Sequence, residues 1–240
     1  MENQLPEIID DKLPRLTVKE IRNETLLFFN LEKGLLFTFV ALMKEPYSTI
    51  QTYLHHNRRK FSNPLQYILI GVALYTILIS IHPGFTKLMK SSNEMNEKSY
   101  AQLEKQFNIK IAEPVERAQG IYFNYQNVFY IFLIPAVGFA TFLLFEKPYN
   151  YAENLAINAY VFGTTTWFSI FITAFTFFIE HIALMFIMPL ISILLMGYLY
   201  KKIFQEDWLK TIGITFIVFG ILMVLSLIFQ FGIAIILMFT

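Results

Sequence analysis

The stretch HHNRRKFSNPLQYILIGVALYTILISI, residues 55–81, joins a run of cations to a long apolar segment. Asn63–Pro64 fits a helix start, because a proline in the first turn removes no intrahelical hydrogen bond. From about 64 to 81 the segment carries no charged residue. A helix needs about 20 mainly apolar residues to cross the hydrocarbon core of a bilayer. We therefore predict that this segment spans a membrane.

Four further apolar stretches follow, at about 128–145, 155–178, 182–200 and 211–239. Five such stretches predict an all-α integral membrane protein, since a soluble helical core would produce one of them only by chance. The composition agrees: 55% of the 240 residues are hydrophobic and 15% are charged, against about 45–50% and about 25% in soluble domains. The net charge of +1 provides no global field for binding nucleic acid.

The predicted spans divide the chain into three parts. Residues 1–17 are polar and interrupted by prolines, and we expect a flexible terminus that is not a secretory signal. Residues 18–62 mix apolar and charged residues at helical spacing, which predicts amphipathic helices on the cytoplasmic face; a small soluble helical domain is the alternative. Residues 63–240 form the transmembrane bundle, with an extracytoplasmic loop at 83–125.

The cations Arg58, Arg59 and Lys60 directly precede the first span. Such a cluster is typical of a cytoplasmic anchor, so we predict that the N-terminus lies inside and the C-terminus outside. The cluster is also expected to meet anionic lipid headgroups. We prefer this to a metal or nucleic-acid site, because adjacent His55 and His56 diverge by about 100° on a helix and no longer basic face accompanies them.

The segment YNYAENLAINAY, residues 149–160, opens the third span with polar side chains. Asn150, Asn154 and Asn158 are spaced i, i+4, i+8 and share one helix face. Glu153 lies beside them, and Thr165 lies further along. Polar groups in a span usually bond neighbouring helices or line a pathway. We favour interhelical bonds; the alternative is a polar cleft formed by these five residues.

Other candidate features are sparse. Pro135 and Pro189 lie inside the second and fourth spans, where each is expected to kink its helix. Because there is no cysteine, no HExxH and no GxSxG motif, we assign no catalytic residue, no metal and no cofactor. Glu180 and His181, in a predicted turn, are the remaining acid–histidine pair that could relay a proton.

The stretch EKGLLFTFVALMKEPYSTIQTYLHHNRRKFSNPLQYILI, residues 32–70, resembles the bacterial membrane family called domain of unknown function 3667. That family shares a glycine-led helix, a P-x-x-T-I-x-x-Y motif, a basic R-x-K-[FY] step and a proline that opens the first span. The matching positions here are Gly34, Pro46, Thr49, Ile50, Tyr53, Arg58, Lys60, Phe61 and Pro64.

A second segment is also similar to that family, whose central span opens with Y-N-x-x-E-x-L. The matching positions are Tyr149, Asn150, Glu153 and Leu155. The resemblance, which touches about residues 18–160, implies the membrane fold and a location in a bacterial inner membrane, and it carries over no activity. Many members have an N-terminal zinc ribbon with paired C-x-x-C motifs, and this chain has no cysteine that could build one. We expect the role of that ribbon to be absent or supplied by another protein.

Three functions stay open from the sequence. The first is a non-enzymatic scaffold, regulatory or assembly component that acts with a membrane-protein partner or as a homo-oligomer. The second is a small transporter or channel with a polar path along the third span. The third is a lipid-modifying enzyme that uses Glu153, or Glu180 with His181.

Overall fold

The computed structural model describes residues 34–87, 90–91, 112–146, 149–177 and 182–238. Within these ranges all regular secondary structure is helical, as predicted. The predicted flexible terminus at 1–17, the part of the amphipathic segment at 18–33, and residues 88–89 and 92–111 of the predicted loop lie outside the described residues.

Three helices of the described chain are long and apolar enough to cross a membrane. They comprise Arg58–Ser80, Tyr151–Thr176 and Trp208–Leu237. The first contains α4 (Pro64–Ser80), the second is α7 (Tyr151–Thr176), and the third forms nearly all of α9 (Trp208–Met238). The predicted first, third and fifth spans therefore coincide with helices that could be membrane spans.

The predicted second and fourth spans coincide with two other helices. α6 covers Ala112–Leu144 and begins well before the predicted start at about 128. Its strongly apolar part is the shorter stretch Ile131–Leu144, because the first half of the helix carries charged and amide side chains. α8 covers Ile182–Phe204. That α6 and α8 also cross the bilayer stays a prediction.

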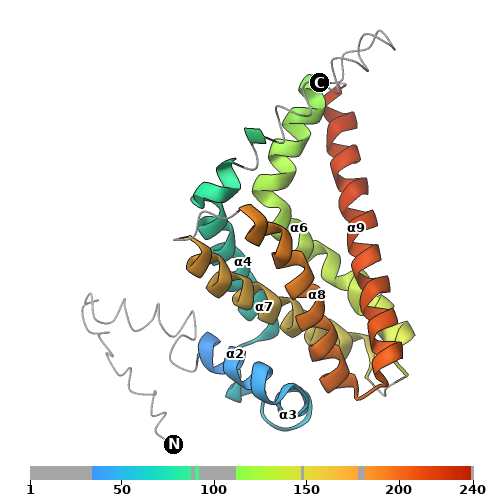
Figure 1. Cartoon of the computed structure of the whole chain (residues 1–240). Helices are drawn as coiled ribbons and strands as arrows, with labels where there is room; N and C mark the ends of the chain where they lie inside the picture. Colours follow the sequence, from blue (N-terminus) through green and yellow to red (C-terminus); the bar gives the residue numbers. More distant parts are fainter. Residues whose placement is uncertain (1–33, 88–89, 92–111, 147–148, 178–181, 239–240) are drawn as a thin grey trace, which may run out of the picture.

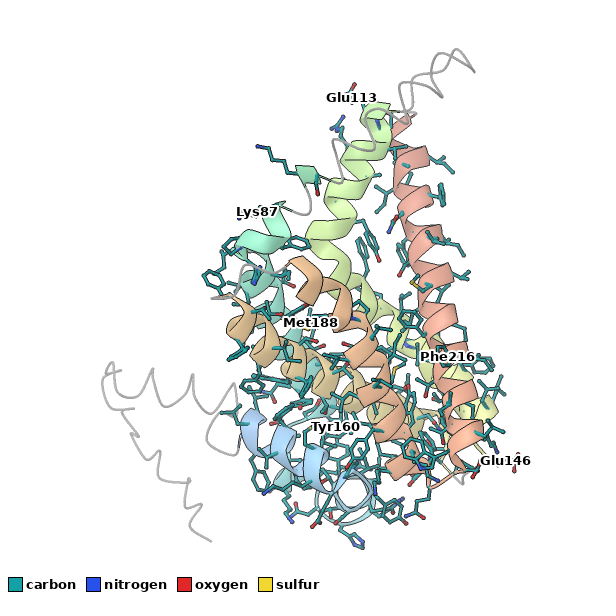
Figure 2. The ribbon with its side chains drawn as sticks, viewed as in Figure 1. Lys87, Glu113, Glu146, Tyr160, Met188 and Phe216 are labelled. Carbon is teal, nitrogen blue, oxygen red and sulfur yellow. The ribbon has the colours of Figure 1, made fainter. Side chains whose placement is uncertain are left out.

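Two helix pairs dominate the packing of the bundle. α4 packs along α7, and α6 packs along α9, which lies beside it in Figure 1. The α4–α7 contact is close: a Cβ atom placed on Gly163 would lie 2.5 Å from Cδ1 of the buried Tyr67 ring. By contrast, much of α9 exposes large apolar side chains such as Phe216, which Figure 2 shows on its outer side. Contact with lipid would keep these apolar side chains out of water.

A compact set of short helices covers one end of the bundle (Figure 1). It consists of α2 (Leu35–Lys44), α3 (Pro46–Gln51), the π-helical turn η2 (Thr52–His56) and the 3-10 turn η3 (Arg58–Lys60). We call these four elements the cap, and the bundle end they cover the cap end. α3 packs on α8 and α2 packs on α7. The opposite end, near His82 and Thr176, is the far end.

Candidate functional site

Hydrogen bonds from several elements hold the cap to the bundle. The Ser62 amide donates to Thr38 Oγ1 of α2 at 3.0 Å, and the Tyr160 hydroxyl of α7 donates to the Ser62 carbonyl at 2.6 Å. Gln51 Nε2 of α3 donates to the Tyr149 hydroxyl at 2.6 Å. These groups are buried or half-buried, where an unpaired polar group would be destabilising. The cap is therefore a fixed part of the fold.

Aromatic packing adds to this attachment. The rings of Tyr53 in the cap and Tyr160 in α7 meet edge to face at 5.2 Å, and Figure 2 shows Tyr160 between the cap and the bundle. Leu42 and Ile50 of the cap are almost completely buried in the main core. Burial raises the pKa of Tyr53 and of Tyr149 above its ordinary value, so both hydroxyls stay neutral at physiological pH.

The outer face of the cap is apolar and basic. On α2 the exposed fractions of Leu36, Phe37 and Val40 are 57%, 50% and 44%. The Phe37 ring stacks on Phe61 at 5.7 Å, and Lys60 Nζ lies 5.5 Å from the centre of the Phe61 ring. Exposed apolar side chains therefore lie next to the predicted cationic anchor. Arg58, Arg59 and Lys60 of that anchor are all exposed in η3.

The positions that carry the family resemblance build this cap. Gly34 precedes α2 with φ 84°, and a Cβ atom there would lie 2.6 Å from Phe37 Cβ, so only glycine fits without strain. Pro46 and Pro64 each occupy the first turn of a helix, α3 and α4. The start of α4 is also capped, because Asn63 Oδ1 accepts a hydrogen bond from the Leu65 amide at 3.0 Å.

Comparison with known families gives the same result as the motifs. Residues 32–76 match the family model described as Protein of unknown function (DUF3667). This match confirms the resemblance for residues 32–76, which include the whole cap and most of α4, and the second motif at 149–155 lies outside it. No curated protein and no solved structure matches the chain.

The five residues of the predicted polar cleft have three different surroundings. Asn150 and Glu153 lie at the start of α7, outside the matched residues 32–76. Asn150 Oδ1 accepts from the Glu153 amide at 2.9 Å, and Glu153 Oε2 accepts from the Asn150 amide at 2.8 Å. This reciprocal pair is a capping box, which stabilises a helix start. The N-x-x-E spacing was visible in the sequence and could have predicted it.

Asn158 lies in a buried hydrogen-bond network between three helices. Its Nδ2 donates to Thr141 Oγ1 of α6 at 2.7 Å, and its Oδ1 accepts from the Tyr200 hydroxyl of α8 at 2.6 Å. Asn154, one turn earlier, donates to the carbonyls of Tyr149 and Asn150 at 3.1 and 3.0 Å. Its Oδ1 is buried and has no hydrogen-bond partner among the described residues. Both asparagines are thus inside the protein and engaged with it.

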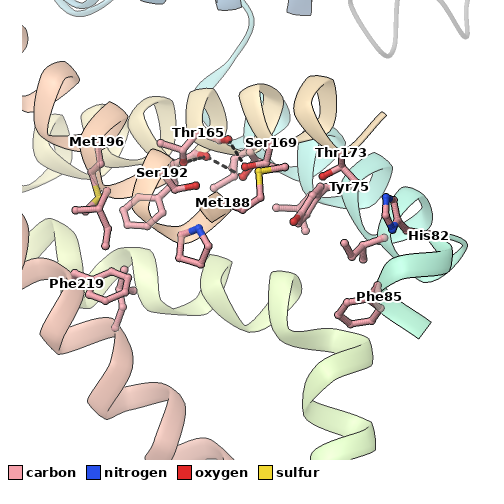
Figure 3. Close-up of a pocket in the computed structure, with 18 of the residues that line it drawn as sticks. Tyr75, His82, Phe85, Thr165, Ser169, Thr173, Met188, Ser192, Met196 and Phe219 are labelled. Atoms are coloured by element: carbon pink, nitrogen blue, oxygen red, sulfur yellow. Dashed lines mark hydrogen bonds between the residues drawn. The ribbon is translucent and has the colours of Figure 1, made fainter. Parts of the chain in front are cut away.

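Thr165, the fifth residue, lies in the wall of a cavity of about 350 Å³. The cavity is formed by α4, α7, α8 and α9 on the far side of the Asn158 network (Figure 3). The polar stripe of α7 continues into it through Ser169 and Thr173. The structure therefore divides the five residues of the predicted cleft among the capping box of α7, the buried hydrogen bonds around Asn158, and the wall of the cavity. The cavity was not predicted.

The remaining candidates are placed as follows. Pro135 lies inside α6, where its carbonyl accepts from the Tyr151 hydroxyl at 3.2 Å, and Pro189 lies inside α8 at the cavity. Glu180 and His181 lie outside the described residues. In the part of the chain that the structure describes, no group of three or more His, Asp or Glu side chains is placed to hold a metal ion.

Proposed function

We propose that this chain is a non-enzymatic component of a bacterial inner membrane, whose cap is the surface that acts with a membrane partner. In this proposal all five predicted spans cross the bilayer. The cap lies on the cytoplasmic face, where the amphipathic helices were expected. The observation that supports it is the two-sided character of the cap, which is fixed to the bundle on one side and exposed on the other.

The outer face of the cap has the chemistry of a surface at the membrane–water boundary. Exposed Phe37 and Val40 can contact acyl chains or an apolar partner helix, and the neighbouring cations can pair with anionic headgroups. Each such cation contributes about 1 kcal/mol near an anionic surface. Because the cap is bonded to α7 and packs on α8, a partner that moves the cap also acts on the bundle.

Two labelling positions test the orientation. The chain has no cysteine, so single cysteines can be introduced without background labelling. We expect Ser48→Cys in the cap and Lys90→Cys beyond α4, both exposed positions, to react with an impermeant thiol reagent from opposite faces of the membrane. Reaction from the same face would overturn the proposed topology.

Photocrosslinking tests the partner surface. A photoreactive amino acid at Val40 on the exposed face of α2 should give an adduct of one defined mass in native membranes. The matched position is Leu74, which is exposed to the same 44% on α4 but lies away from the cap. We expect no protein adduct from Leu74. Equal adducts from both positions, or none from Val40, would contradict a partner surface on the cap.

A transporter is the second candidate, because the polar stripe of α7 ends in an open cavity. Its path would have to pass the Asn158 network, which closes the stripe toward the cap end. If the chain transports a solute, Asn154→Leu and Glu153→Gln should abolish flux into liposomes without reducing expression. Absence of flux in the unmodified protein would remove this candidate.

A lipid-modifying enzyme is less well supported. Glu153, one of its expected acids, takes part in the capping box at the start of α7. Its Oε2 accepts from the Asn150 amide at 2.8 Å, which gives the carboxylate a structural role at the helix start. A lipid-modifying activity that survives combined Glu153→Ala and His181→Ala substitution would rule out the assigned residues.

A further inference from the structure

The cavity at the far side of the Asn158 network has the dimensions of a ligand site. Its volume of about 350 Å³ lies within the range of about 300–1,000 Å³ that is usual for small-molecule pockets. It reaches the outside of the bundle between α8 and α9, since Pro189 is exposed and Met223, in the same wall, is 52% exposed. A membrane-dissolved molecule can therefore enter from the lipid side.

One wall of the cavity offers hydrogen-bond acceptors. Thr165 and Thr166 each donate their hydroxyl proton to the Phe162 carbonyl at 2.8 Å, and Ser169 donates to the Thr165 carbonyl at 2.9 Å (Figure 3). Each hydroxyl oxygen keeps lone pairs that can accept a second bond. We call these three hydroxyl groups the hydroxyl row. Because their protons are already donated within α7, the row can accept a hydrogen bond from a donor group on a ligand. Ser192 of α8 lines the same cavity with a further hydroxyl.

The far end of the cavity is polar without carrying a fixed charge. His82 Nδ1 accepts from the Gly84 amide at 3.2 Å, which leaves Nε2 facing Thr176 Oγ1 at 3.5 Å. Thr176 in turn donates to the Thr173 carbonyl at 3.0 Å. Among the described residues that line the cavity there is no Lys, Arg, Asp or Glu. A charged ligand would lose its hydration there without gaining a counter-ion.

Apart from Tyr75 and Ser192, the side chains of α4, α8 and α9 that line the cavity are apolar and suit a flexible hydrocarbon chain. Met188 and Met196 of α8, with Phe219, Leu222 and Met223 of α9, oppose the hydroxyl row. Methionine side chains adapt to ligands of irregular shape. The site thus has one edge that accepts hydrogen bonds, an apolar body and an opening toward lipid.

We propose that this cavity binds a neutral single-chain lipid with a free hydroxyl group, the class to which long-chain alcohols and monoacylglycerols belong. The ligand hydroxyl donates to the row formed by Thr165, Thr166 and Ser169, and it accepts from Ser192. The chain lies against the methionines and leaves between α8 and α9. This site is separate from the cap and does not depend on the partner surface proposed above.

Two photoreactive probes test the proposal. The full chain is reconstituted in phosphatidylcholine vesicles with dodecanol or dodecane. Each probe carries a diazirine near one end of its chain, which in dodecanol is the hydroxyl end. The alcohol should label peptides that contain Thr165–Ser169 or Met188–Met196, and excess unlabelled dodecanol, but not dodecane, should suppress the labelling. Equal labelling by the two probes, spread over lipid-facing Leu194 and Phe216, would show general lipid contact and overturn the proposal. Absence of cavity adducts would also overturn it.

A pair of matched variants isolates the hydroxyl row. Thr165→Val with Ser169→Ala removes two acceptors but keeps the cavity apolar and of similar size, and we expect the dodecanol adduct to fall about tenfold. Thr211→Val with Ser226→Ala removes the same two hydroxyl types from α9 outside the cavity and should leave labelling unchanged. Both variants should keep the unfolding transition of the parent protein. Equal labelling of both variants by dodecanol would contradict recognition by the hydroxyl row.

Discussion

The two halves of α7 carry similar polar side chains and use them in opposite ways. Near the cap end, Asn158 bonds to Thr141 of α6 and to Tyr200 of α8, so its polar groups join three helices. Further along, Thr165 and Ser169 bond, among the described residues, to carbonyls of α7 itself, and they face a cavity. A polar residue in a span therefore has a structural role where another helix supplies its partner. Where none of the described helices does, it lines a cavity.

The largest effect is expected from breaking the network of the first half. Asn158→Leu removes the acceptor of the Tyr200 hydroxyl and leaves that hydroxyl unpaired in a fully buried position. Lost hydrogen bonds and an unsatisfied buried donor together should lower the free energy of unfolding by about 2–4 kcal/mol. Titration with SDS in mixed micelles measures it.

A double-mutant cycle provides the control for this network. Adding Tyr200→Phe to Asn158→Leu removes the orphaned hydroxyl, so the double variant should lose less stability than the two single losses summed. Strict additivity would mean that the two side chains do not interact in the folded protein.

The next largest effect concerns the close packing of α7 on α4, for which α9 provides the comparison. Gly163→Ala places a Cβ atom 2.5 Å from the buried ring of Tyr67, which has no room to move. Overpacking of this kind usually costs about 1–3 kcal/mol. Gly220→Ala in α9, where nothing lies within 4 Å, should leave the stability unchanged or raise it slightly. The same unfolding titration compares them, and equal losses would refute a tight α4–α7 contact.

A smaller and more local effect is expected at the start of the cap. Gly34→Ala puts a side chain at φ 84° and 2.6 Å from Phe37 Cβ. The strain should cost about 1 kcal/mol or somewhat more. The contacts that hold the cap are with α7 and α8 at the cap end. Faster hydrogen exchange should therefore appear in residues 35–56 and not in α9. Loosening of both regions together would show that the cap and bundle unfold as one unit.

Local chemistry explains which parts of the fold could be predicted from the sequence. Pro64 after Asn63, and the uncharged run that follows, placed the start of α4 correctly. The second span was predicted from about 128, and the helix that contains it begins at Ala112. The polar residues before the apolar run give no hydropathy signal, so the sequence did not show that they belong to the same helix. A hydropathy pattern locates apolar segments, and helices can extend well beyond them.

The candidate site was less predictable for a physical reason. Helical spacing puts Asn154 and Asn158 on one face of α7, with Thr165 further along. It does not reveal that Tyr200 lies beside Asn158, or that none of the described side chains fills the space beside Thr165. The contact between Gln51 and Tyr149, 98 residues apart, depends in the same way on tertiary packing. Such partners come from other helices, so one helix's sequence cannot specify them.

The smallest expected loss of stability compares the two halves of α7 most directly. Thr165→Val removes a hydroxyl whose single protein bond lies within α7, and Thr166 donates to the same Phe162 carbonyl, so we expect a loss below about 0.5 kcal/mol. The same substitution at Thr141 also removes the acceptor of Asn158 Nδ2 in a fully buried position, and it should cost about 1–3 kcal/mol. Both are measured by the SDS titration. If Thr165→Val is as destabilising as Thr141→Val, the second half of α7 is also structural, and its hydroxyl row is not free for a ligand.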